Sequence, residues 1–471
     1  MTQVKTRFAP SPTGLIHFGN VRTALFNVLL AKKTAGVFLL RIEDTDFERS
    51  REEYTQALQE DLRWLELDWQ EGEDAGGAAA PYRQSQRTAA YEKYLGQLEQ
   101  QGDVYPCFCS AVELEISRKV QAAASKPPRY SGKCTHLKAE DVAQKKAEGA
   151  PYTLRFRMPK NTALSFDDVV RGALKFPSED IGDFIIRRSD GSFAFFFVNA
   201  VDDALMGVTH VLRGEDHLTN TPRQIALLQA LDLPVPTYGH ISLIVDAQGA
   251  PLSKRSGSLS VQELREIGYF PIAVNNYLAR LGHHFIETEL MDLEQLSQAF
   301  DQSHLGRAPA RYDRGQLDYW QSQAVQQVAE GQFMAWLAPA IKGFVPEADM
   351  DAFARVVRPN ITFPHDARLW AEALYTDALP LSAEARTVLE AASSDLFRSA
   401  VDALHEDMDF KAFTQRVKQT SGASGKALFL PLRAALTGQT FGPEMPALFS
   451  LMGYDRARHR LMQHVLSSEI D

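Results

Sequence analysis

"FAPSPTGLIHFGN" (residues 8–20) is the stretch that decides how the first part of this chain folds. Residues 4–8, which lead into it, have the alternating pattern of a short strand. Residues 21–36, which follow it, carry apolar side chains at helical spacing and close with two lysines and a glycine. We expect Asn20 to cap this helix. A strand joined to a helix through a loop rich in proline and glycine predicts an α/β fold.

A second strand and a second helix follow. "VFLLRIEDTD" (residues 37–46) has the pattern of a buried strand that ends in charged residues. "SREE" predicts a capping box between Ser50 and Glu53, which would open a helix that runs toward Trp64. This alternation of strands and helices is typical of a parallel sheet covered by helices.

The pattern changes further along the chain. Residues 107–190 are rich in cysteine, proline and basic residues, which indicates an insertion. Sheet-like segments return at residues 192–218 and 240–258, and the apolar run "FAFFFVNAV" (residues 193–201) predicts a core strand. From about Val261 onward the pattern is helical.

Length and composition limit the class of protein. A chain of 471 residues is too long for one ordinary core and predicts roughly two to four domains. Its composition is that of a globular protein, and no run approaches the roughly 18–20 apolar residues that span a membrane. We expect a cytoplasmic monomer with no membrane partner. The net charge of −10 argues only weakly against a nucleic-acid partner, because phosphate binding depends on where the cations lie.

Two loops carry the residue types that bind phosphates. Gly14 and Gly19 would let the backbone approach a phosphate at the start of the first helix, and His17 could donate to a phosphate oxygen. The alternative is a turn that these residues merely shape, with His17 at the surface. Far downstream, "LSKRSGS" (residues 252–258) is basic and rich in serine and glycine, and Lys254 could neutralise charge that develops on a triphosphate.

Together the two loops resemble the paired signature motifs of class I aminoacyl-tRNA synthetases. The similarity to bacterial glutamyl-tRNA synthetases is closer still, and it extends from Arg7 to about Gln262. The matching segments, in order, are "RFAPSPTG", "RTALFN", "LLRIEDTD", "DDALMGVTHVLRGEDHLTNTPRQ" and "LSKR". The resemblance implies that ATP drives the attachment of L-glutamate to the 3′ end of tRNA-Glu through a glutamyl-adenylate, with Mg²⁺ on the phosphates of ATP.

The resemblance also implies a domain organisation. It predicts a Rossmann-like α/β catalytic domain with a zinc-bearing insertion, followed by an all-α region that binds the anticodon. The implied bounds are 1–105 for the first half of the catalytic domain, 106–192 for the acceptor-stem insertion, 193–250 for the second catalytic half, 251–312 for the basic loop and stem-contact helices, and 313–471 for the anticodon-binding region.

The residues of the site follow from the same resemblance. Arg7 and Arg213 match cations that bind the substrate carboxylates, with Arg213 on the side-chain carboxylate, and Glu43 suits the ammonium group. The alternative is that Glu43 and Arg213 simply pair with each other. The other positions around the amino acid are Ala9, Ser11 and Asn199. The positions around ATP are His17, Gly19, Asp216 and Lys254, of which His17, Gly19 and Lys254 are expected to be catalytic.

Two positions depart from the family pattern. Pro251 stands where the first lysine of the basic loop is common, and Phe195 stands where a tyrosine near the amino acid is usual. The missing hydroxyl removes one hydrogen bond, which is worth roughly 0.5–1.5 kcal/mol. These departures concern substrate affinity and leave the class of reaction unchanged.

The three cysteines of the chain lie close to one another in the sequence. Cys107 and Cys109 form one pair, and Cys134 with His136 forms a second, which together give a Cys₃His set typical of structural zinc. The alternatives are ordinary free thiols or, less favoured in a cytosolic protein, a disulfide. The whole stretch resembles the zinc-bearing acceptor-stem insertion of many bacterial glutamyl-tRNA synthetases.

Basic residues gather near the end of the chain and fit a surface that faces phosphates, although a solvated helix face is the alternative. They are Lys411, Arg416, Lys418, Lys426, Arg433, Arg456, Arg458 and Arg460. Whether tRNA-Gln is charged as well as, or instead of, tRNA-Glu is left open. In the family an arginine of the helical half is associated with this choice, and here only Arg358 and Arg368 flank the corresponding stretch.

Other functions share part of these signals. A nucleotidyltransferase also has a histidine–glycine loop on an α/β sheet, but it would not need the long helical part of the chain. A tRNA-modifying glutamyl transferase normally lacks that part as well, and a glutaminyl-tRNA synthetase typically ends in β-barrels.

Overall fold

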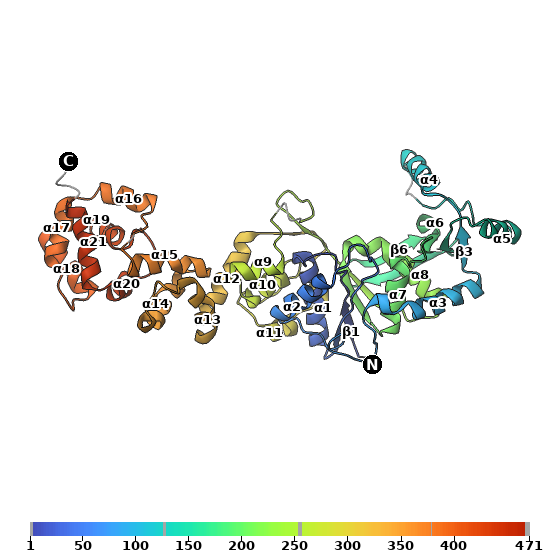
Figure 1. Ribbon diagram of the computed structural model, residues 1–471, viewed down its shortest axis with the longest axis horizontal. Helices are drawn as coiled ribbons and strands as arrows, with labels where there is room; N and C mark the ends of the chain where they lie inside the picture. Colours follow the sequence, from blue (N-terminus) through green and yellow to red (C-terminus); the bar gives the residue numbers. More distant parts are fainter. Residues whose placement is uncertain (1–2, 126–128, 253–256, 378, 467–471) are drawn as a thin grey trace. The chain divides into compact units, whose positions relative to one another are not determined.

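The structure is a computed structural model that describes residues 3–125, 129–252, 257–377 and 379–466 (Figure 1). The chain divides into two compact units. The first unit comprises Met1–Leu264 with Pro271–Gln316, and the second comprises Arg265–Phe270 with Leu317–Asp471.

Two pairs of parallel strands form the centre of the first unit. Strand β1 pairs with β2 from Lys5↔Val37 to Phe8↔Leu40, and β8 pairs with β9 in the same sense. The two pairs lie side by side, because the backbone N–H of Thr209 donates to the carbonyl of Lys5 at 2.9 Å. The bounds are β1 (Lys5–Phe8), β2 (Val37–Leu40), β8 (His210–Gly214) and β9 (Thr237–Ile241). This arrangement confirms the predicted α/β catalytic fold.

Helix α1 (Phe18–Lys33) connects β1 to β2 and packs against both of them and β8. It begins earlier than predicted, because His17 occupies the N-cap position and Asn20 lies within the first turn. The expectation that Asn20 caps the helix is therefore wrong. At its other end the chain turns back beside β1 at Gly36, where an added Cβ would lie 2.3 Å from the carbonyl oxygen of Val4. Only glycine allows that approach.

The predicted capping box before the second helix is also wrong. Helix α2 (Glu52–Trp64) starts with Arg51 at the N-cap position, and no side chain caps it there. The Ser50 hydroxyl is buried without a hydrogen-bond partner among the described residues. The backbone at this point is held by the loop after β1, since the N–H of Arg51 donates to the carbonyl of Pro12 at 3.0 Å.

The apolar run at residues 193–201 forms a helix and not the predicted core strand. Most of the run lies in α7 (Phe195–Leu205), which packs against α8 (Thr221–Ala230). Phe197, Val198 and Val201 are fully buried. An unbroken apolar run lacks the periodicity that separates a buried strand from a helix buried on most sides, so the pattern alone could not decide.

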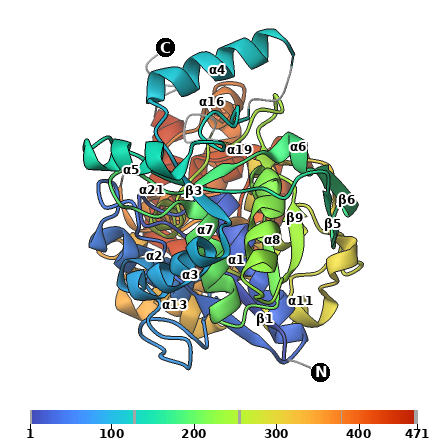
Figure 2. The ribbon, with the colours of Figure 1, turned by 90° about the vertical axis from the view of Figure 1, so that its right-hand side faces the viewer.

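The insertion forms its own small sheet, in which β4 pairs antiparallel with β3 and β7. It also contains α4, α5 and an antiparallel hairpin of β5 and β6. Helices α4 and α5 lie at one end of the first unit, and the hairpin lies beside β9 (Figure 2). The bounds are β3 (Val104–Cys107), α4 (Ala111–Ala123), α5 (Ala139–Ala147), β4 (Thr153–Phe156), β5 (Ala163–Asp168), β6 (Gly172–Pro177), α6 (Ser178–Ile181) and β7 (Phe184–Arg187).

The remaining elements of the first unit lie around the parallel strands. They are α3 (Thr88–Gln101), β10 (Ile244–Val245), α9 (Val261–Ile267), whose last residues belong to the second unit, α10 (Pro271–Arg280), α11 (Leu293–Ala299) and β11 (Ala310–Arg311). Strand β11 pairs with β10, so one short strand follows Val261 where the sequence predicts only helices.

The described residues of the second unit contain helices and no strand, as predicted. These helices are α12 (Arg314–Gln327), which begins in the first unit, α13 (Glu330–Ile341), α14 (Met350–Val357), α15 (Pro364–Tyr375), α16 (Ala383–Glu390), α17 (Ser394–Ala403), α18 (Phe410–Ser421), α19 (Lys426–Thr437), α20 (Met445–Met452) and α21 (Tyr454–Leu466). Within the described ranges, no helix has both the length and the apolar character needed to cross a bilayer.

The basic residues near the end of the chain do not all face solvent. Arg456 and Arg460 donate to carbonyls at the end of α15, those of Leu374 and Thr376 among them, and Arg433 donates to the carbonyl of Pro443 at 3.0 Å. Arg456 and Arg460 therefore stabilise the end of α15. All three arginines are engaged with backbone carbonyls. The exposed members are Lys411, Arg416, Lys418, Lys426 and Arg458.

Candidate active site

A cavity of about 470 Å³ opens where β1 and β8 end and α1 begins. In a parallel sheet this edge is where ligands bind, because the strand ends leave a crevice and the following helix presents free N–H groups. Most of the residues predicted from the sequence line the cavity. They are Arg7, Ala9, Ser11, Gly19, Glu43, Asn199, Arg213 and Asp216.

Two predicted residues are not among the lining residues. His17 lies two residues before Gly19 at the N-cap position of α1, and its backbone pairs with Ser260. Lys254 lies outside the described residues. Pro251, which precedes the basic loop, forms a bridge with Val245.

Space for a ligand lies at the N-terminus of α1. A Cβ added at Gly14 or at Gly19 would meet no heavy atom within 4 Å, so the protein's own packing does not require glycine at either position. Asn20 and Thr23 on the first turns of the helix also face the cavity. An open helix N-terminus of this kind favours an anionic group such as a phosphate.

Two arginines share one buried carboxylate beneath the cavity. Asp203 on α7 accepts from Nε of Arg7 at 3.3 Å and from Nη1 of Arg41 at 2.7 Å. Burial would raise the pKa of Asp203, but the two guanidinium groups lower it below its ordinary value. All three side chains are almost fully buried. Arg41 and Asp203 are residues of the site that were not predicted from the sequence.

A chain of hydrogen bonds continues from this cluster across the floor of the cavity. Glu43 accepts from Nη2 of Arg41 at 2.9 Å and from Nδ2 of Asn199 at 2.6 Å. Asn199 in turn accepts from Gln224 on α8 at 2.7 Å. Burial raises the pKa of Glu43, while Arg41 and Arg7 act against that rise. The chain ends at Arg213, whose Nη2 donates to Gln224 at 2.6 Å.

Arg213 is a buried cation whose described partners are all uncharged. Besides Gln224, its Nη2 donates to the hydroxyl of Thr221 at 2.7 Å, and its Nε donates to Nε2 of His240 at 3.2 Å. Its Nη1 is buried and has no hydrogen-bond partner among the described residues. Burial lowers the pKa of Arg213 to about 10, so the group stays charged at neutral pH.

Glu43 does not pair with Arg213. Within the described parts of the chain, no carboxylate oxygen lies within 4.0 Å of the Arg213 guanidinium, and Glu43 is held by Arg41. A buried charge without a partner is costly, so a site that keeps one is built for a ligand of opposite charge.

Phe195 lies at the start of α7 and faces the cavity, where its ring lies 5.6 Å from the ring of His217. The next residue, Phe196, lines a second groove of about 580 Å³ between the insertion and α7. Five arginines line that groove with Tyr130 and one acidic residue, Asp183. The arginines are Arg118, Arg129, Arg155, Arg188 and Arg223.

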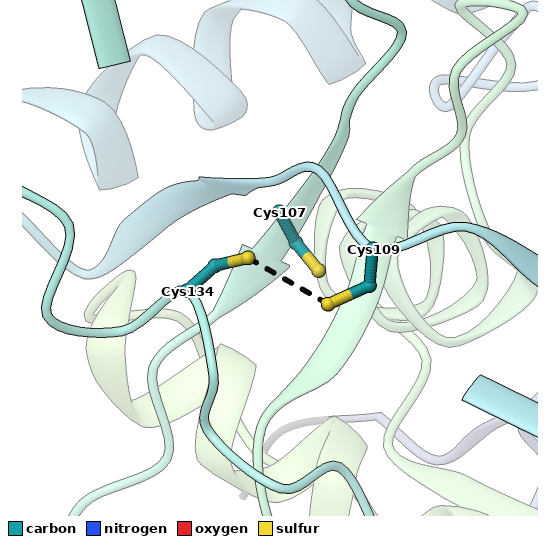
Figure 3. A group of neighbouring side chains, drawn as sticks. All are labelled: Cys107, Cys109 and Cys134. Atoms are coloured by element: carbon teal, nitrogen blue, oxygen red, sulfur yellow. Dashed lines mark hydrogen bonds between the residues drawn. The ribbon is translucent and has the colours of Figure 1, made fainter. Parts of the chain in front are cut away.

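The three cysteines of the insertion form one cluster, in which their side chains point toward one another (Figure 3). All three are free thiols whose sulfurs lie within 4.8 Å of one another, and Sγ of Cys109 lies 3.7 Å from Sγ of Cys134. The hydroxyl of Tyr130 lies 3.4 Å from Sγ of Cys107 and 3.6 Å from Sγ of Cys109. His136 is exposed and is not a member of this group.

The environment favours a thiolate at Cys107. Burial alone would raise the pKa of Cys107, but hydrogen bonds with Tyr130 and Arg155 lower it to about 7. Burial raises the pKa of Cys109 to about 11. Sequence reasoning missed Tyr130, although its place four residues before Cys134 could have pointed to it.

Comparisons with known proteins agree with this geometry. Residues 3–319 match the family described as tRNA synthetases class I (E and Q), catalytic domain, and residues 331–465 match an anticodon binding domain. The chain is 55% identical to "Glutamate--tRNA ligase 2" of Nitrosococcus oceani over 98% of each chain. It is 53% identical to "Glutamate--tRNA ligase 1" of Methylococcus capsulatus over the full length of both.

A solved structure shares the fold over nearly the whole length. The crystal structure of a glutamate tRNA ligase from Elizabethkingia meningosepticum, in complex with its amino acid, superposes with a TM-score of 0.88. It is 27% identical in sequence and covers 99% of each chain.

Proposed function

The chain belongs to the glutamate–tRNA ligases of the class I aminoacyl-tRNA synthetases, and from this premise we propose how its cavity joins L-glutamate to tRNA-Glu. The observation that carries the proposal is Arg213, a buried cation with an unbonded Nη1 in a cavity at the carboxyl ends of parallel strands. A glutamate side-chain carboxylate supplies the anion that the described residues do not offer to Arg213.

In the first step the α-carboxylate of glutamate attacks the α-phosphorus of ATP and pyrophosphate leaves. Arg7, held by Asp203, binds the α-carboxylate, and Glu43 faces the ammonium group. The reacting atoms come from the two substrates, so the protein acts by positioning them and by stabilising charge. Ala9, Ser11 and Asn199 complete the amino-acid side of the cavity.

ATP lies at the N-terminus of α1. Gly19 leaves room for the phosphates, His17 at the N-cap of α1 donates to them, and Asp216 also lines the cavity. Lys254 on the basic loop stabilises charge on the phosphates as the bond to pyrophosphate breaks. Mg²⁺ bound to the phosphates adds further charge neutralisation.

In the second step a hydroxyl of the terminal ribose attacks the glutamyl carbonyl and AMP leaves. The groove beside Phe196 suits the single-stranded 3′ end, because it combines five arginines with aromatic rings. Arg223 lies over the ring of Phe196 at 5.4 Å, and Arg155 lies over the ring of Tyr130 at 3.9 Å. Phe195 lines the cavity and its neighbour Phe196 lines the groove, so the two sites lie on adjacent residues of α7.

The cysteine cluster suits a structural zinc ion. Zinc bonds sulfur at about 2.3 Å, which separates two sulfurs of a tetrahedral site by about 3.8 Å, and the distance from Cys109 to Cys134 is 3.7 Å. A zinc–oxygen bond of about 2.0 Å places oxygen and sulfur about 3.5 Å apart. The hydroxyl of Tyr130 meets that distance to Cys107 and Cys109, whereas His136 remains a ligand on sequence grounds only.

The domain bounds inferred from the sequence form part of the proposal. The change from catalytic to anticodon-binding region at 312–313 lies close to the division of the compact units near residue 316 and to the end of the catalytic family match at 319. We further propose that the enzyme is a cytoplasmic monomer whose exposed lysines and arginines on α18, α19 and α21 contribute to the tRNA-binding surface.

The test is ATP–pyrophosphate exchange with each amino acid in turn, measured in the presence of tRNA-Glu. We expect exchange with L-glutamate only, and we expect Arg213→Gln to lose it. Exchange that selects glutamine, or that needs no amino acid, would assign the chain another function.

A further inference from the structure

Asp168 and His240 form a buried pair behind Arg213. Nδ1 of His240 lies 2.5 Å from Oδ2 of Asp168, and both side chains are fully buried. The pair stands next to the cavity without lining it. Among the described residues, Nε2 of His240 contacts Arg213, which lines the cavity, and the hydroxyl of Thr221. A longer connection runs from Oδ1 of Asp168 through Arg171 and Glu215 to the backbone of Leu243.

Asp168 fixes which ring nitrogen of His240 carries the proton. A carboxylate accepts hydrogen bonds, so Nδ1 must be the N–H that donates to it. Nε2 is then left with its lone pair and can accept from Nε of Arg213 at 3.2 Å. With the proton on Nε2, two N–H groups would face each other and Arg213 would lose this contact.

The charges of the three groups agree with this assignment. Burial would raise the pKa of Asp168, but His240 and the backbone N–H groups of Arg171 and Val170 lower it, so the carboxyl is ionised. Burial lowers the pKa of His240; the contact with Asp168 acts against that change, the guanidinium groups of Arg213 and Arg171 act with it, and the pKa stays below its ordinary value. The neutral ring therefore stands between a buried anion and a buried cation.

This arrangement holds Arg213 at Nε and leaves its Nη1 unoccupied among the described residues. A carboxylate in direct contact would take the N–H groups that a substrate needs. Asp168 instead acts one ring away, so that Nη1 of Arg213 stays without a partner among the described residues.

Asp168 itself is contributed by the insertion and not by the parallel strands. It is the last residue of β5, and its Oδ1 accepts from the N–H groups of Val170 at 2.9 Å, Arg171 at 2.8 Å and His240 at 3.2 Å. The turn that follows is fixed to the catalytic unit, since Val169 donates to Tyr238 on β9 at 2.9 Å and Arg307 donates to Val170 at 2.8 Å.

We propose that Asp168 and His240 are positioning residues for amino-acid selection, and that Asp168, acting through the His240 ring, holds Arg213 with its Nη1 available to the side-chain carboxylate of glutamate. This proposal rests on the function proposed above for Arg213. It means that the amino-acid site is completed by a residue of the insertion.

The first test is Asp168→Asn, compared with Asp167→Asn, which makes the same change at the exposed neighbouring position on β5. The amide keeps an oxygen for the backbone N–H groups but presents NH₂ to Nδ1, which forces the proton of His240 onto Nε2. We expect KM for glutamate to rise at least about tenfold, with kcat and the KM values for ATP and tRNA within about threefold. Unchanged glutamate kinetics in a folded Asp168→Asn variant would overturn the proposal.

The second test asks whether Asp168 acts through His240. In His240→Gln the side-chain amide can turn its oxygen toward Arg213 whatever stands at position 168. Adding Asp168→Asn to this variant should therefore change KM for glutamate by less than about twofold. Fully additive effects would show that Asp168 acts only through the turn after β5, and would overturn the proposal.

Two further measurements separate the possible failures. If Arg213→Gln leaves glutamate kinetics unchanged, the function proposed for Arg213 fails; if Arg213→Gln is impaired while Asp168→Asn is not, only the present proposal fails. The tautomer is measured directly in the unmodified enzyme by ¹⁵N NMR, with the His240 signals identified by their loss in His240→Gln. We expect a protonated Nδ1 and an unprotonated Nε2, and the reverse would overturn the proposal even if Asp168→Asn cannot be purified.

Discussion

Arg213 and Glu43 carry opposite charges in one cavity and are each engaged elsewhere. Glu43 is bonded by Arg41 and Asn199, whereas Arg213 is bonded by the neutral side chains of Gln224 and Thr221 and by His240. This separation leaves a negative and a positive group to meet the ammonium and the side-chain carboxylate of one amino acid. We therefore propose that the site selects by charge at two points, as a site for glutamate must.

Arg213→Gln removes the cation that this account assigns to the side-chain carboxylate. A charge-assisted hydrogen bond contributes about 1.5–3 kcal/mol, so kcat/KM for glutamate should fall by about 10- to 100-fold or more. Steady-state aminoacylation over a range of glutamate concentrations measures the change. Arg49→Gln, at an exposed arginine paired with Asp46, is the control and should behave as the unmodified enzyme. Unchanged discrimination between glutamate and glutamine in Arg213→Gln would show that another cation selects the substrate.

Asp203→Asn tests the cluster beneath the cavity. It leaves the buried guanidinium groups of Arg7 and Arg41 without their shared carboxylate, which should cost about 3–5 kcal/mol and lower Tm by at least about 5 °C. The exposed pair of Asp46 and Arg49 provides the control, because solvent screens it and Asp46→Asn should leave Tm almost unchanged.

The same variant predicts a dependence on pH. The pKa of Asp203 is lowered in the folded protein, so its stabilising effect is present above the pKa of an unfolded aspartate, about 3.9, and is lost as pH falls through the lower folded value. The difference in unfolding free energy between the unmodified enzyme and Asp203→Asn should be constant from about pH 8 to pH 5 and should shrink below about pH 4. A gap that widens on acidification would contradict the ion-pair account.

Several residues of this site could not have been found by pattern alone. Arg7 and Arg213 lie near the carboxyl ends of β1 and β8, and Glu43 follows β2. Polar residues at such positions indicate a ligand edge, so the sequence and the family resemblance point to these three. Asp203 and His240 matter because of partners that lie 196 and 72 residues away in the chain, namely Arg7 and Asp168. Only the folded chain brings such partners together.

At the scale of elements, the first catalytic strands and helix α7 differ in how far their local sequence determines them. The strands β1 and β2 and the helix α1 follow from alternation, helical spacing and glycine, with errors only at the caps. Helix α7 is different, because its apolar residues are buried on most sides and carry no clear period. Its character is set by packing against α8, a contact that the local sequence does not contain.

The cysteine cluster predicts the metal content of the insertion. Elemental analysis of the purified enzyme should find one zinc ion per chain, and Cys134→Ser should lower that content, since the remaining donors cannot complete a tetrahedral site. Tyr130→Phe should weaken zinc retention against a chelator, whereas His136→Ala should not. Faster zinc loss in His136→Ala than in Tyr130→Phe would show that histidine is the fourth ligand. Full aminoacylation by metal-free protein would show that the zinc site is not needed for binding the acceptor stem.

The basic loop, whose central residues 253–256 lie outside the described ranges, carries one prediction from the sequence. Lys254→Ala should lower the rate of glutamate activation at least about tenfold, or about 1.4 kcal/mol of transition-state stabilisation, while tRNA binding is kept. Pyrophosphate exchange in the presence of tRNA measures the rate, and a tRNA-binding assay provides the control. Exchange kinetics close to those of the unmodified enzyme would exclude Lys254 from the mechanism.

At the scale of the whole molecule, the described residues of the cavity, the arginine-lined groove and the cysteine cluster all belong to the first compact unit. The second unit adds helices with exposed lysines and arginines, three of which, Lys411, Arg416 and Lys418, lie on α18. The side chain of Arg358 is bonded to the protein backbone, because its Nε donates to the carbonyl of Val325 at 2.7 Å near the end of α12. This argues against a contact between Arg358 and a base of tRNA. Arg368 pairs with Glu372 on the exposed side of α15.

Both arginines that flank residues 359–367 therefore have partners within the protein, and charging assays with the two tRNAs test the choice between tRNA-Glu and tRNA-Gln. A paired hydrogen bond from an arginine to a base contributes about 1–3 kcal/mol of discrimination. An enzyme without this hydrogen bond would therefore charge tRNA-Gln measurably as well as tRNA-Glu. The relatives are named for glutamate, which agrees with a cavity that selects a carboxylate side chain.

The most direct measurement is aminoacylation of purified tRNA-Glu and tRNA-Gln with labelled glutamate and labelled glutamine, each in the presence of ATP and Mg²⁺. We predict that glutamate is attached to tRNA-Glu, that glutamine is attached to neither, and that charging of tRNA-Gln with glutamate is slower by at least about tenfold. Arg213→Gln, run beside it, should lose the glutamate product. Attachment of glutamine in place of glutamate, or no attachment to tRNA-Glu at high enzyme concentration, would contradict the account.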